Sequence, residues 1–191
     1  MLTATDMLRP ARPDDAAAMA SLINIAGEGL PVYFWKMIAP DADPFATGRA
    51  RAMRDEGGFS WTNAHVIEAD GVARALLITY PISDAPEPVD PANTPPVFLP
   101  LEELESLAPG SFYVNVLATE AGYRKRGFGS RLLEQAIALA GDRSMSIIVS
   151  DANENAMRLY EAHGFAPAAS RPIVKGDGWA CDGKNWVLML R

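Results

Sequence analysis

One stretch of this chain, residues 113–129, constrains the possible folds more than any other. It reads Y-V-N-V-L-A-T-E-A-G-Y-R-K-R-G-F-G, so a strand-like apolar run at 113–118 passes through a turn into a basic loop. A helical pattern follows at residues 130–140. Glycine lets a backbone approach a ligand closely, and the unpaired N–H groups of a first helical turn point outward with positive dipole character. The order of strand, loop and helix therefore predicts an anion-binding loop.

The loop combines positive charge with backbone freedom. Its residues are Arg124, Lys125, Arg126, Gly127, Phe128, Gly129 and Ser130. Backbone amides would supply shape and the three cations charge, which suits a multiply charged phosphate. Two common phosphate motifs do not fit. The chain has no Gly-Lys-Ser or Gly-Lys-Thr of a P-loop, and Leu132 stands where a dinucleotide fingerprint needs its third glycine.

The pattern that does fit is R-x-x-G-x-G, with Arg124, Gly127 and Gly129 at its fixed positions. On these residues the chain resembles the GCN5-related N-acetyltransferase (GNAT) family. A second segment supports the resemblance: N-E-N-A-M-R-L-Y-E-A-H-G-F at residues 153–165 is similar to the family's N-x-x-A-x-x-L-Y-E-x-x-G-F segment. The resemblance is specific over residues 113–165, and it implies a single N-acetyltransferase domain over residues 1–191.

The fold class implied by the resemblance is α/β (α+β), with a GNAT-like acyl-CoA N-acyltransferase fold. This fold has a central, mostly antiparallel mixed sheet of about seven strands, flanked by about four to five helices. The sequence patterns agree with it. Asp70-Gly71 predicts a hairpin between strands at 59–69 and 72–80. The strand, helix and strand within residues 113–150 predict a right-handed crossover between two parallel strands.

The amino-terminal third carries helical patterns and a cluster of aromatic residues. A helix is expected from residue 14 to residue 26, and another at 44–56 with Phe45, Ala52 and Met53 turned inward. Tyr33, Phe34 and Trp35 are consecutive, so at least one of them faces away from the buried side of a helix. Of the three, we expect Phe34 to pack in the core.

Residues 81–110 form an acidic, proline-rich insert. They hold eight of the fifteen prolines and six acidic residues, with no Lys or Arg. An extended loop is expected first, followed by a short helix at 99–107 that tolerates Pro100 in its first turn. Two interpretations remain open. The insert is either a solvated loop that keeps the protein soluble, or a lid whose acidic rim attracts a cationic acceptor.

Composition excludes several other classes of protein. The 191 residues carry a net charge of -7 with a pI near 4.8, which argues against a nucleic-acid partner. No apolar run approaches the roughly 18 residues of a membrane span, and no signal peptide is recognisable. We therefore expect a cytoplasmic protein. The one cysteine rules out an internal disulfide, and the two histidines, His65 and His163, lack metal-ligand spacing.

The activity implied by the resemblance is acetyl transfer from acetyl-CoA, the co-substrate, to a primary amine of a small molecule, without a metal. The backbone at 117–119 would pair with the pantetheine arm, the basic loop would hold the diphosphate, and Tyr160 would act as general acid toward the CoA thiolate. The CoA-binding positions so implied are Leu117, Ala118, Thr119, Arg124, Lys125, Arg126, Gly127, Phe128, Gly129, Ser130, Asn153 and Tyr160.

The general base is not identified by the sequence. The central strand carries Asn115 where an acid would be useful, so the candidates are Glu28, Glu68 or water alone. Other functions also remain open. The chain could be an acyl-CoA-binding regulatory module without turnover, or it could acetylate a protein N-terminus or lysine. Exposed strand edges would permit a homodimer.

Overall fold

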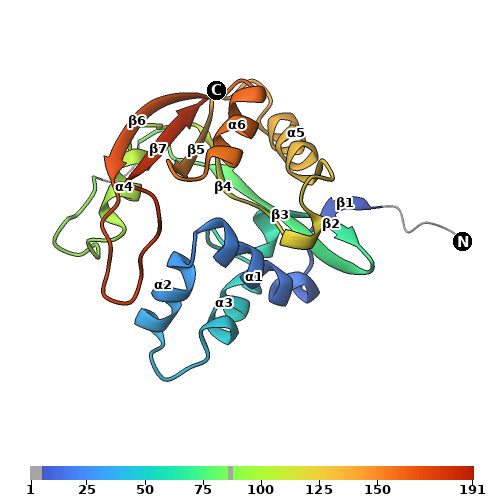
Figure 1. The fold of residues 1–191 in the computed structure, drawn as a ribbon, viewed down its shortest axis with the longest axis horizontal. Helices are drawn as coiled ribbons and strands as arrows, with labels where there is room; N and C mark the ends of the chain where they lie inside the picture. Colours follow the sequence, from blue (N-terminus) through green and yellow to red (C-terminus); the bar gives the residue numbers. More distant parts are fainter. Residues whose placement is uncertain (1–5, 86–87) are drawn as a thin grey trace, which may run out of the picture. The chain divides into compact units, whose positions relative to one another are not determined.

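The sheet of this protein is mixed, as expected, with one parallel strand pair. The structure is a computed structural model that describes residues 6–85 and 88–191. Its strands follow the order β1-β2-β3-β4-β5-β7-β6 (Figure 1). The strands are β1 (Met7–Pro10), β2 (Ala64–Ala69), β3 (Val72–Pro81), β4 (Phe112–Thr119), β5 (Met145–Ser150), β6 (Ala166–Pro172) and β7 (Asn185–Leu190).

The described residues also form six α-helices, one more than the upper expectation. They are α1 (Ala16–Ala26), α2 (Leu30–Ile38), α3 (Pro44–Ala52), α4 (Leu99–Glu105), α5 (Phe128–Ala140) and α6 (Glu154–Ala162). The additional helix is α2, in the aromatic segment. Gly29 precedes it in the left-handed region with φ 85°, and Pro31 lies in its first turn, where the missing N–H has no cost.

The chain divides into two compact units, which we describe separately. The first unit comprises Met1–Thr79 and Asn115–Ala136, and the second comprises Tyr80–Val114 and Ile137–Arg191. The divisions fall inside β3, β4 and α5. Each unit is therefore built from two segments of the sequence.

In the first unit, β1, β2 and β3 form an antiparallel meander. Leu8 pairs with Ile67 across β1 and β2, and Val66 pairs with Leu76 across β2 and β3. The predicted hairpin turn is confirmed. Asp70 and Gly71 have φ values of 53° and 75°, the left-handed pair that a two-residue type I′ turn requires.

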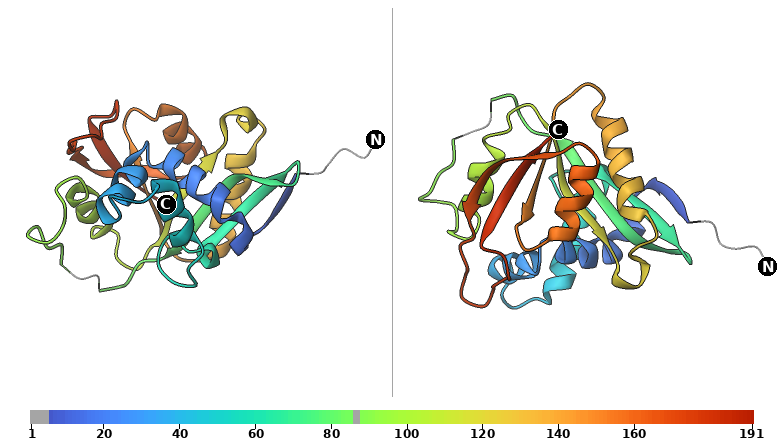
Figure 2. Two further views of the ribbon diagram at one scale, coloured as in Figure 1. Left: turned by 90° about the horizontal axis from the view of Figure 1, so that it is seen from below. Right: turned by 45° about the horizontal axis from the view of Figure 1, so that its top comes forward.

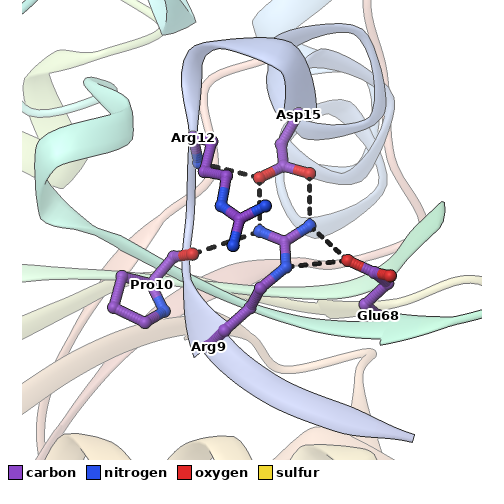
Figure 3. Close-up of polar contacts among 5 residues, drawn as sticks. All are labelled: Arg9, Pro10, Arg12, Asp15 and Glu68. Carbon is purple, nitrogen blue, oxygen red and sulfur yellow. Dashed lines mark hydrogen bonds and ion pairs between the residues drawn. The ribbon is translucent and has the colours of Figure 1, made fainter. Parts of the chain in front are cut away.

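An ion-pair network joins β1 and β2 to the start of the first helix (Figure 3). Arg9 of β1 donates to both carboxylate oxygens of Asp15, at 2.7 and 2.9 Å, and its Nε donates to Glu68 Oε2 of β2 at 2.8 Å. Asp15 also accepts the Arg12 backbone N–H at 2.7 Å. Burial alone would raise the pKa of Asp15, but these donors outweigh it and lower the pKa. The network ties β1, β2 and the start of α1 together.

Helix packing in the first unit corrects the expectation for the aromatic cluster. Trp35, rather than Phe34, is the buried member, with 3% of its surface exposed. The reason lies in α3, where Gly48 has no side chain and so leaves room for the indole. A Cβ added at Gly48 would lie 2.5 to 2.7 Å from three carbons of the Trp35 ring. Phe34 is half-buried and lies 5.1 Å below the guanidinium of Arg51.

The same packing corrects the expected inner face of α3. The helix ends at Ala52 rather than near residue 56, and its buried positions are Gly48 and Ala52. Phe45 is 42% exposed and Met53 is 45% exposed, so the expectation that both face inward is wrong. Phe45 contacts Trp35 only edge-on, with ring centroids 5.9 Å apart. Small residues, not large ones, form the contact surface of this helix.

In the second unit, β7 lies between β5 and β6 and is antiparallel to both, as the right view of Figure 2 shows. β5 pairs in parallel with the first residues of β4, over Phe112–Val114 and Met145–Ile147. The predicted crossover pair is therefore confirmed. The long tip of the β6–β7 hairpin carries Trp179, which is buried and stacks on Trp186 with ring centroids 6.4 Å apart.

The insert at residues 81–110 packs into the second unit through its second half. Helix α4 contacts β5, β6 and β7, and Leu104 is fully buried. Glu103 of α4 pairs with Arg171 of β6, with Nε 2.6 Å from Oε2. The predicted short helix is confirmed, and this half of the insert is a packed element rather than a solvated loop.

Candidate functional site

The basic loop has the backbone geometry of an anion cradle. Lys125 and Gly127 have φ values of 62° and 78°, and α5 begins at Phe128 rather than at the expected Ser130. A non-glycine residue in the left-handed region costs roughly 1–2 kcal/mol, and such strain concentrates at functional sites. Among the described residues, no backbone hydrogen bond is donated by the N–H groups of residues 125–130. The next N–H group, that of Arg131, donates to Gly127 O at 3.1 Å. The N–H groups of residues 125–130 can therefore serve a ligand.

Tyr123 links the basic loop to the turn between β2 and β3. Its hydroxyl donates to Asp70 Oδ2 at 2.7 Å, a bond that raises the pKa of Tyr123. Two guanidinium groups lie over its ring, that of Arg74 at 4.9 Å and that of Arg126 at 4.6 Å from the centroid. Arg74 in turn pairs with Glu120 at 2.8 Å. The sequence interpretation assigned no role to Tyr123, although an aromatic residue between a turn and three cations is a recognisable cation–π signal.

The side chains of the loop divide into exposed cations and one core residue. Arg124, Lys125 and Arg126 are exposed, and so is Gly127. A Cβ added at Gly127 would meet no atom within 4 Å, so the space above this backbone is open. Phe128 is 2% exposed and packs in the core. Phe128 can therefore offer a ligand its backbone N–H but not its ring.

The end of β4 adjoins this loop in the first unit. Ala118 is buried, whereas Leu117 and Thr119 on either side are half-buried. Arg124 Nε donates to Thr119 O at 3.3 Å and so fixes the loop against the strand end. The predicted pantetheine-binding backbone and the predicted diphosphate loop are thus adjacent parts of one unit.

The predicted acid, Tyr160, lies in the second unit on α6. It is 5% exposed, and its ring packs against Phe165 with centroids 6.2 Å apart. Burial raises the pKa of Tyr160. At neutral pH the phenol is therefore fully protonated, which is the state that a proton donor needs.

Asn153 serves as the N-cap of α6. Its Oδ1 accepts the Ala156 backbone N–H at 3.2 Å, and the residue is exposed. The neighbouring Asp151 accepts the backbone N–H groups of Lys184 and Asn185 at 2.8 and 3.0 Å. Both polar residues before α6 thus have structural bonds, and the predicted contact of Asn153 with CoA remains a prediction.

A carboxylate that the sequence interpretation passed over lies in the same unit as Tyr160. Glu105, at the end of α4, accepts a hydrogen bond from the Tyr113 phenol, and burial raises the pKa of Glu105 to about 7. The Tyr113 ring meets that of Tyr80 edge-on, with centroids 5.8 Å apart. The helical pattern held a signal for this position, because Glu105 follows Leu101 by four residues and precedes Ala108 by three, on the apolar side of the helix.

The base candidates named from the sequence receive less support. Glu68 is bound to Arg9 in the network of Figure 3. Glu28 lies in the turn before α2 with a φ of 51°. Within the residues that the structure describes, no three His, Cys, Asp or Glu side chains group as metal ligands, and no helix is long and apolar enough to cross a membrane.

Comparison with known families gives one clear match. The model of the acetyltransferase (GNAT) family matches residues 34–165, which include both motifs. The uncharacterized protein ML0378 of Mycobacterium leprae is 32% identical over 83 residues, which make up 44% of this chain and 22% of that protein. The chain thus spans only a small part of that relative's length.

Solved structures with low sequence identity share the fold. An N-acetyltransferase from Staphylococcus aureus Mu50 is 17% identical, with a TM-score of 0.64 over 97% of this chain and 100% of that one. The ribosomal-protein-S18-alanine N-acetyltransferase of Escherichia coli is 17% identical, with a TM-score of 0.60 over 97% and 92%. Arabidopsis thaliana Naa50, in complex with the bisubstrate analogue CoA-Ac-MVNAL, is 13% identical, with a TM-score of 0.55 over 97% of each chain.

Proposed function

The chain belongs to the acetyltransferase (GNAT) family, and from that premise we propose that it transfers the acetyl group of acetyl-CoA to the primary amine of a small molecule. The family match spans residues 34–165, and this family uses acetyl-CoA as its co-substrate. Two finer assignments belong to the proposal. The basic loop holds the CoA diphosphate, and Tyr160 is the general acid.

One observation supports the proposal more than any other: the loop combines free amides with fixed positive charge. Left-handed Lys125 and Gly127 turn the backbone toward the first turn of α5, and Arg126 is held over Tyr123. Consecutive amides near a helix N-terminus favour a phosphate group, and guanidinium groups add charge-assisted hydrogen bonds. The residues present therefore fit a diphosphate.

The roles of the other residues follow from what the reaction requires. When bound, acetyl-CoA would supply the reactive thioester. The backbone of Leu117, Ala118 and Thr119 would orient the extended pantetheine arm by strand-like hydrogen bonds. Tyr160 would give its phenolic proton to the departing sulfur, and burial keeps that proton on the oxygen until it is needed.

A small acceptor is favoured by aromatic side chains that the core does not use. Tyr33 and Phe34 of α2 are half-buried, and rings in that state offer apolar area for enclosing a compact ligand. The resemblance assigns the region of α2 and α3 to the acceptor. Peptides with a free N-terminus are the competing acceptors, and the experiment below includes them.

The test begins with calorimetric titration of acetyl-CoA and CoA into the purified protein. The probe variant is Arg126→Glu, and the matched control is Arg143→Glu, the same charge reversal at an exposed residue beyond the end of α5. We expect the affinity of the probe variant to fall by about tenfold or more, because a phosphate contact is replaced by repulsion. The control should bind like the wild type.

Turnover is then followed by thiol release with simple primary amines and with short peptides. Faster release with small amines than with peptides would support the proposal. Tight binding without release for any acceptor would instead favour a regulatory module that only binds acyl-CoA. Absence of CoA binding, with the protein folded, would overturn the assignment of the loop.

A further inference from the structure

The side chain of Tyr123 contacts four others from three parts of the first unit. The guanidinium carbons of Arg126 and Arg74 lie 4.6 and 4.9 Å from its ring centroid. The Phe128 ring stacks on it, with centroids 6.3 Å apart and 21° between the planes. Its hydroxyl donates to Asp70 Oδ2 at 2.7 Å. Tyr123 is half-buried, and both its ring and its hydroxyl have partners.

The two guanidinium groups of the basic loop are held in different ways. Arg124 Nε donates to Thr119 O at 3.3 Å, so the strand end uses part of its hydrogen-bonding capacity. Within residues 6–85 and 88–191, the Arg126 side chain makes no ion pair or hydrogen bond, and it lies over the Tyr123 ring. A cation–π contact requires no hydrogen-bond acceptor. The N–H donors of Arg126 therefore remain available to a ligand.

The ring that holds Arg126 also contacts the start of the helix that offers free amides. Phe128 is the first residue of α5, and it is only 2% exposed. The N–H groups of residues 125–130 donate no backbone hydrogen bond in the described part of the chain. A Cβ added at Gly127 would meet no atom within 4 Å. The charged group and the open backbone are thus fixed against one ring.

The ring itself is anchored to the sheet. Asp70, which accepts the Tyr123 hydroxyl, lies in the turn between β2 and β3 with a φ of 53°. Arg74 of β3 pairs with Glu120 at 2.8 Å, and the backbone carbonyl of Arg74 accepts the Glu120 N–H at 2.9 Å. All of these residues belong to the first unit. The turn and β3 therefore fix the position of the ring.

We propose that Tyr123 is a positioning residue for CoA: the sheet holds its ring, and the ring holds the Arg126 guanidinium where the free N–H donors bind the CoA diphosphate. This inference rests on the proposed function, because it takes the basic loop as the CoA-binding loop. It adds a residue that lies outside the R-x-x-G-x-G motif. It also makes CoA affinity depend on a turn 53 positions away in the chain.

The expected size of the effect follows from the contact. An unrestrained arginine loses side-chain conformational freedom when it binds a phosphate. Contact with the Tyr123 ring restricts that freedom before the ligand binds, so less is lost on binding. An exposed cation–π contact corresponds to a factor of about two to five in an equilibrium constant. Loss of the ring should weaken CoA binding by about this factor.

The test is a double-mutant cycle, with the Kd of CoA measured by calorimetry and folding checked by urea unfolding. Tyr123→Leu should raise the Kd about two- to fivefold. Arg126→Ala should raise it more, because the phosphate contact itself is lost. In the Arg126→Ala protein, Tyr123→Leu should have almost no further effect, since no guanidinium remains to be positioned. A tyrosine that only stabilised the loop would weaken both proteins equally.

Two matched variants sharpen the cycle. Tyr123→Phe keeps the ring but loses the bond to Asp70, so its Kd should lie between those of the wild type and Tyr123→Leu. Arg143→Ala removes an exposed guanidinium beyond the end of α5. In that control protein, Tyr123→Leu should keep its full effect. The cycle with dephospho-CoA, which has the diphosphate but lacks the 3′-phosphate, should give the same coupling as the cycle with CoA.

A measurement on the unmodified protein does not depend on how the variants fold. In the NMR spectrum without ligand, the side-chain protons of Arg126 should be shifted upfield by the ring current of Tyr123, with the signals assigned by comparison with Arg126→Lys. Absence of that shift would overturn the inference. Its presence would support the contact from which the coupling is expected.

Three results of the binding experiments would overturn the inference in different ways. If the wild type binds CoA and Tyr123→Leu weakens binding equally with and without Arg126, Tyr123 positions nothing, and the proposed function stands. Coupling with CoA but not with dephospho-CoA would assign Arg126 to the 3′-phosphate instead of the diphosphate. If the folded wild type binds no CoA, the assignment of the loop and this inference fall together.

Discussion

At the scale of single residues, burial decides what each functional side chain can do. Tyr160 and Glu105 are both mostly removed from water, and burial raises the pKa of each. The effect on the two groups is the same, because burial disfavours the charged form of a phenol and of a carboxyl alike. At neutral pH Tyr160 therefore keeps its proton, whereas Glu105, with a pKa of about 7, is about half ionised.

The role of Tyr160 can be tested by removing one oxygen atom. Tyr160→Phe should lower kcat by about 10² to 10⁴-fold, because the leaving thiolate loses its proton donor. Acetyl-CoA affinity should hardly change, since the ring still packs against Phe165. The measurement is a comparison of kcat with the calorimetric Kd. Full activity of the variant would refute the assignment.

The residues of the basic loop could be predicted from the sequence, whereas the contacts that hold the loop in place could not. Arg124, Gly127 and Gly129 stand out as a motif because their spacing is local. Tyr123 and Asp70 are joined only by the fold, across 53 positions of the chain. Glu105 was missed for a related reason: whether an acid on an amphipathic helix is solvated depends on what packs over it, and no periodicity records that.

At the scale of elements, α2 and α3 show how a small residue selects a partner. The Trp35 ring lies directly against Gly48. The indole of α2 thus fills the space that a side chain at position 48 of α3 would occupy. Sequence patterns predicted the existence of α3 but not its inner face, because hydrophobic periodicity counts Phe45 and Met53 as core and assigns nothing to glycine. Close packing, not hydrophobicity, settled the orientation.

Gly48→Ala should therefore destabilise the protein despite the better helix propensity of alanine. The added Cβ would lie 2.5 to 2.7 Å from the Trp35 ring, and overpacking of this kind costs about 1–3 kcal/mol, against about 1 kcal/mol gained in propensity. The measurement is the free energy of unfolding in urea. Ala50→Leu, at an exposed position of the same helix, is the control and should have little effect. Equal or greater stability of Gly48→Ala would contradict the packing described for Trp35.

At the scale of the whole molecule, stability should depend on pH through Glu105. Its pKa is about 7 in the fold against an ordinary value of 4.5, so the folded state binds the proton more tightly. The resulting stabilisation is complete below pH 4.5 and is lost as the pH rises to about 7. The difference between 4.5 and about 7 corresponds to a loss on the order of 3 to 4 kcal/mol, at about 1.4 kcal/mol for each unit of pKa.

The check is the free energy of unfolding of the wild type and of Glu105→Gln at several pH values between 4.5 and 8. The difference between the two proteins should change from pH 4.5 to about 7 and be nearly constant from there to pH 8. Burial lowers the pKa of His65, which acts in the opposite direction in the wild type, but this contribution cancels in the difference. A constant difference throughout would mean that Glu105 is solvated in the folded protein.

The division of the chain inside β3, β4 and α5 has a consequence for how such a protein can change over generations. The basic loop belongs to one unit and Tyr160 to the other, yet each unit is assembled from two separate stretches of the sequence. Exchange of one unit between related genes would need three junctions, each inside a strand or a helix. The basic loop and Tyr160 are therefore expected to be inherited together, and new acceptor specificities to arise by substitution within both units rather than by shuffling them.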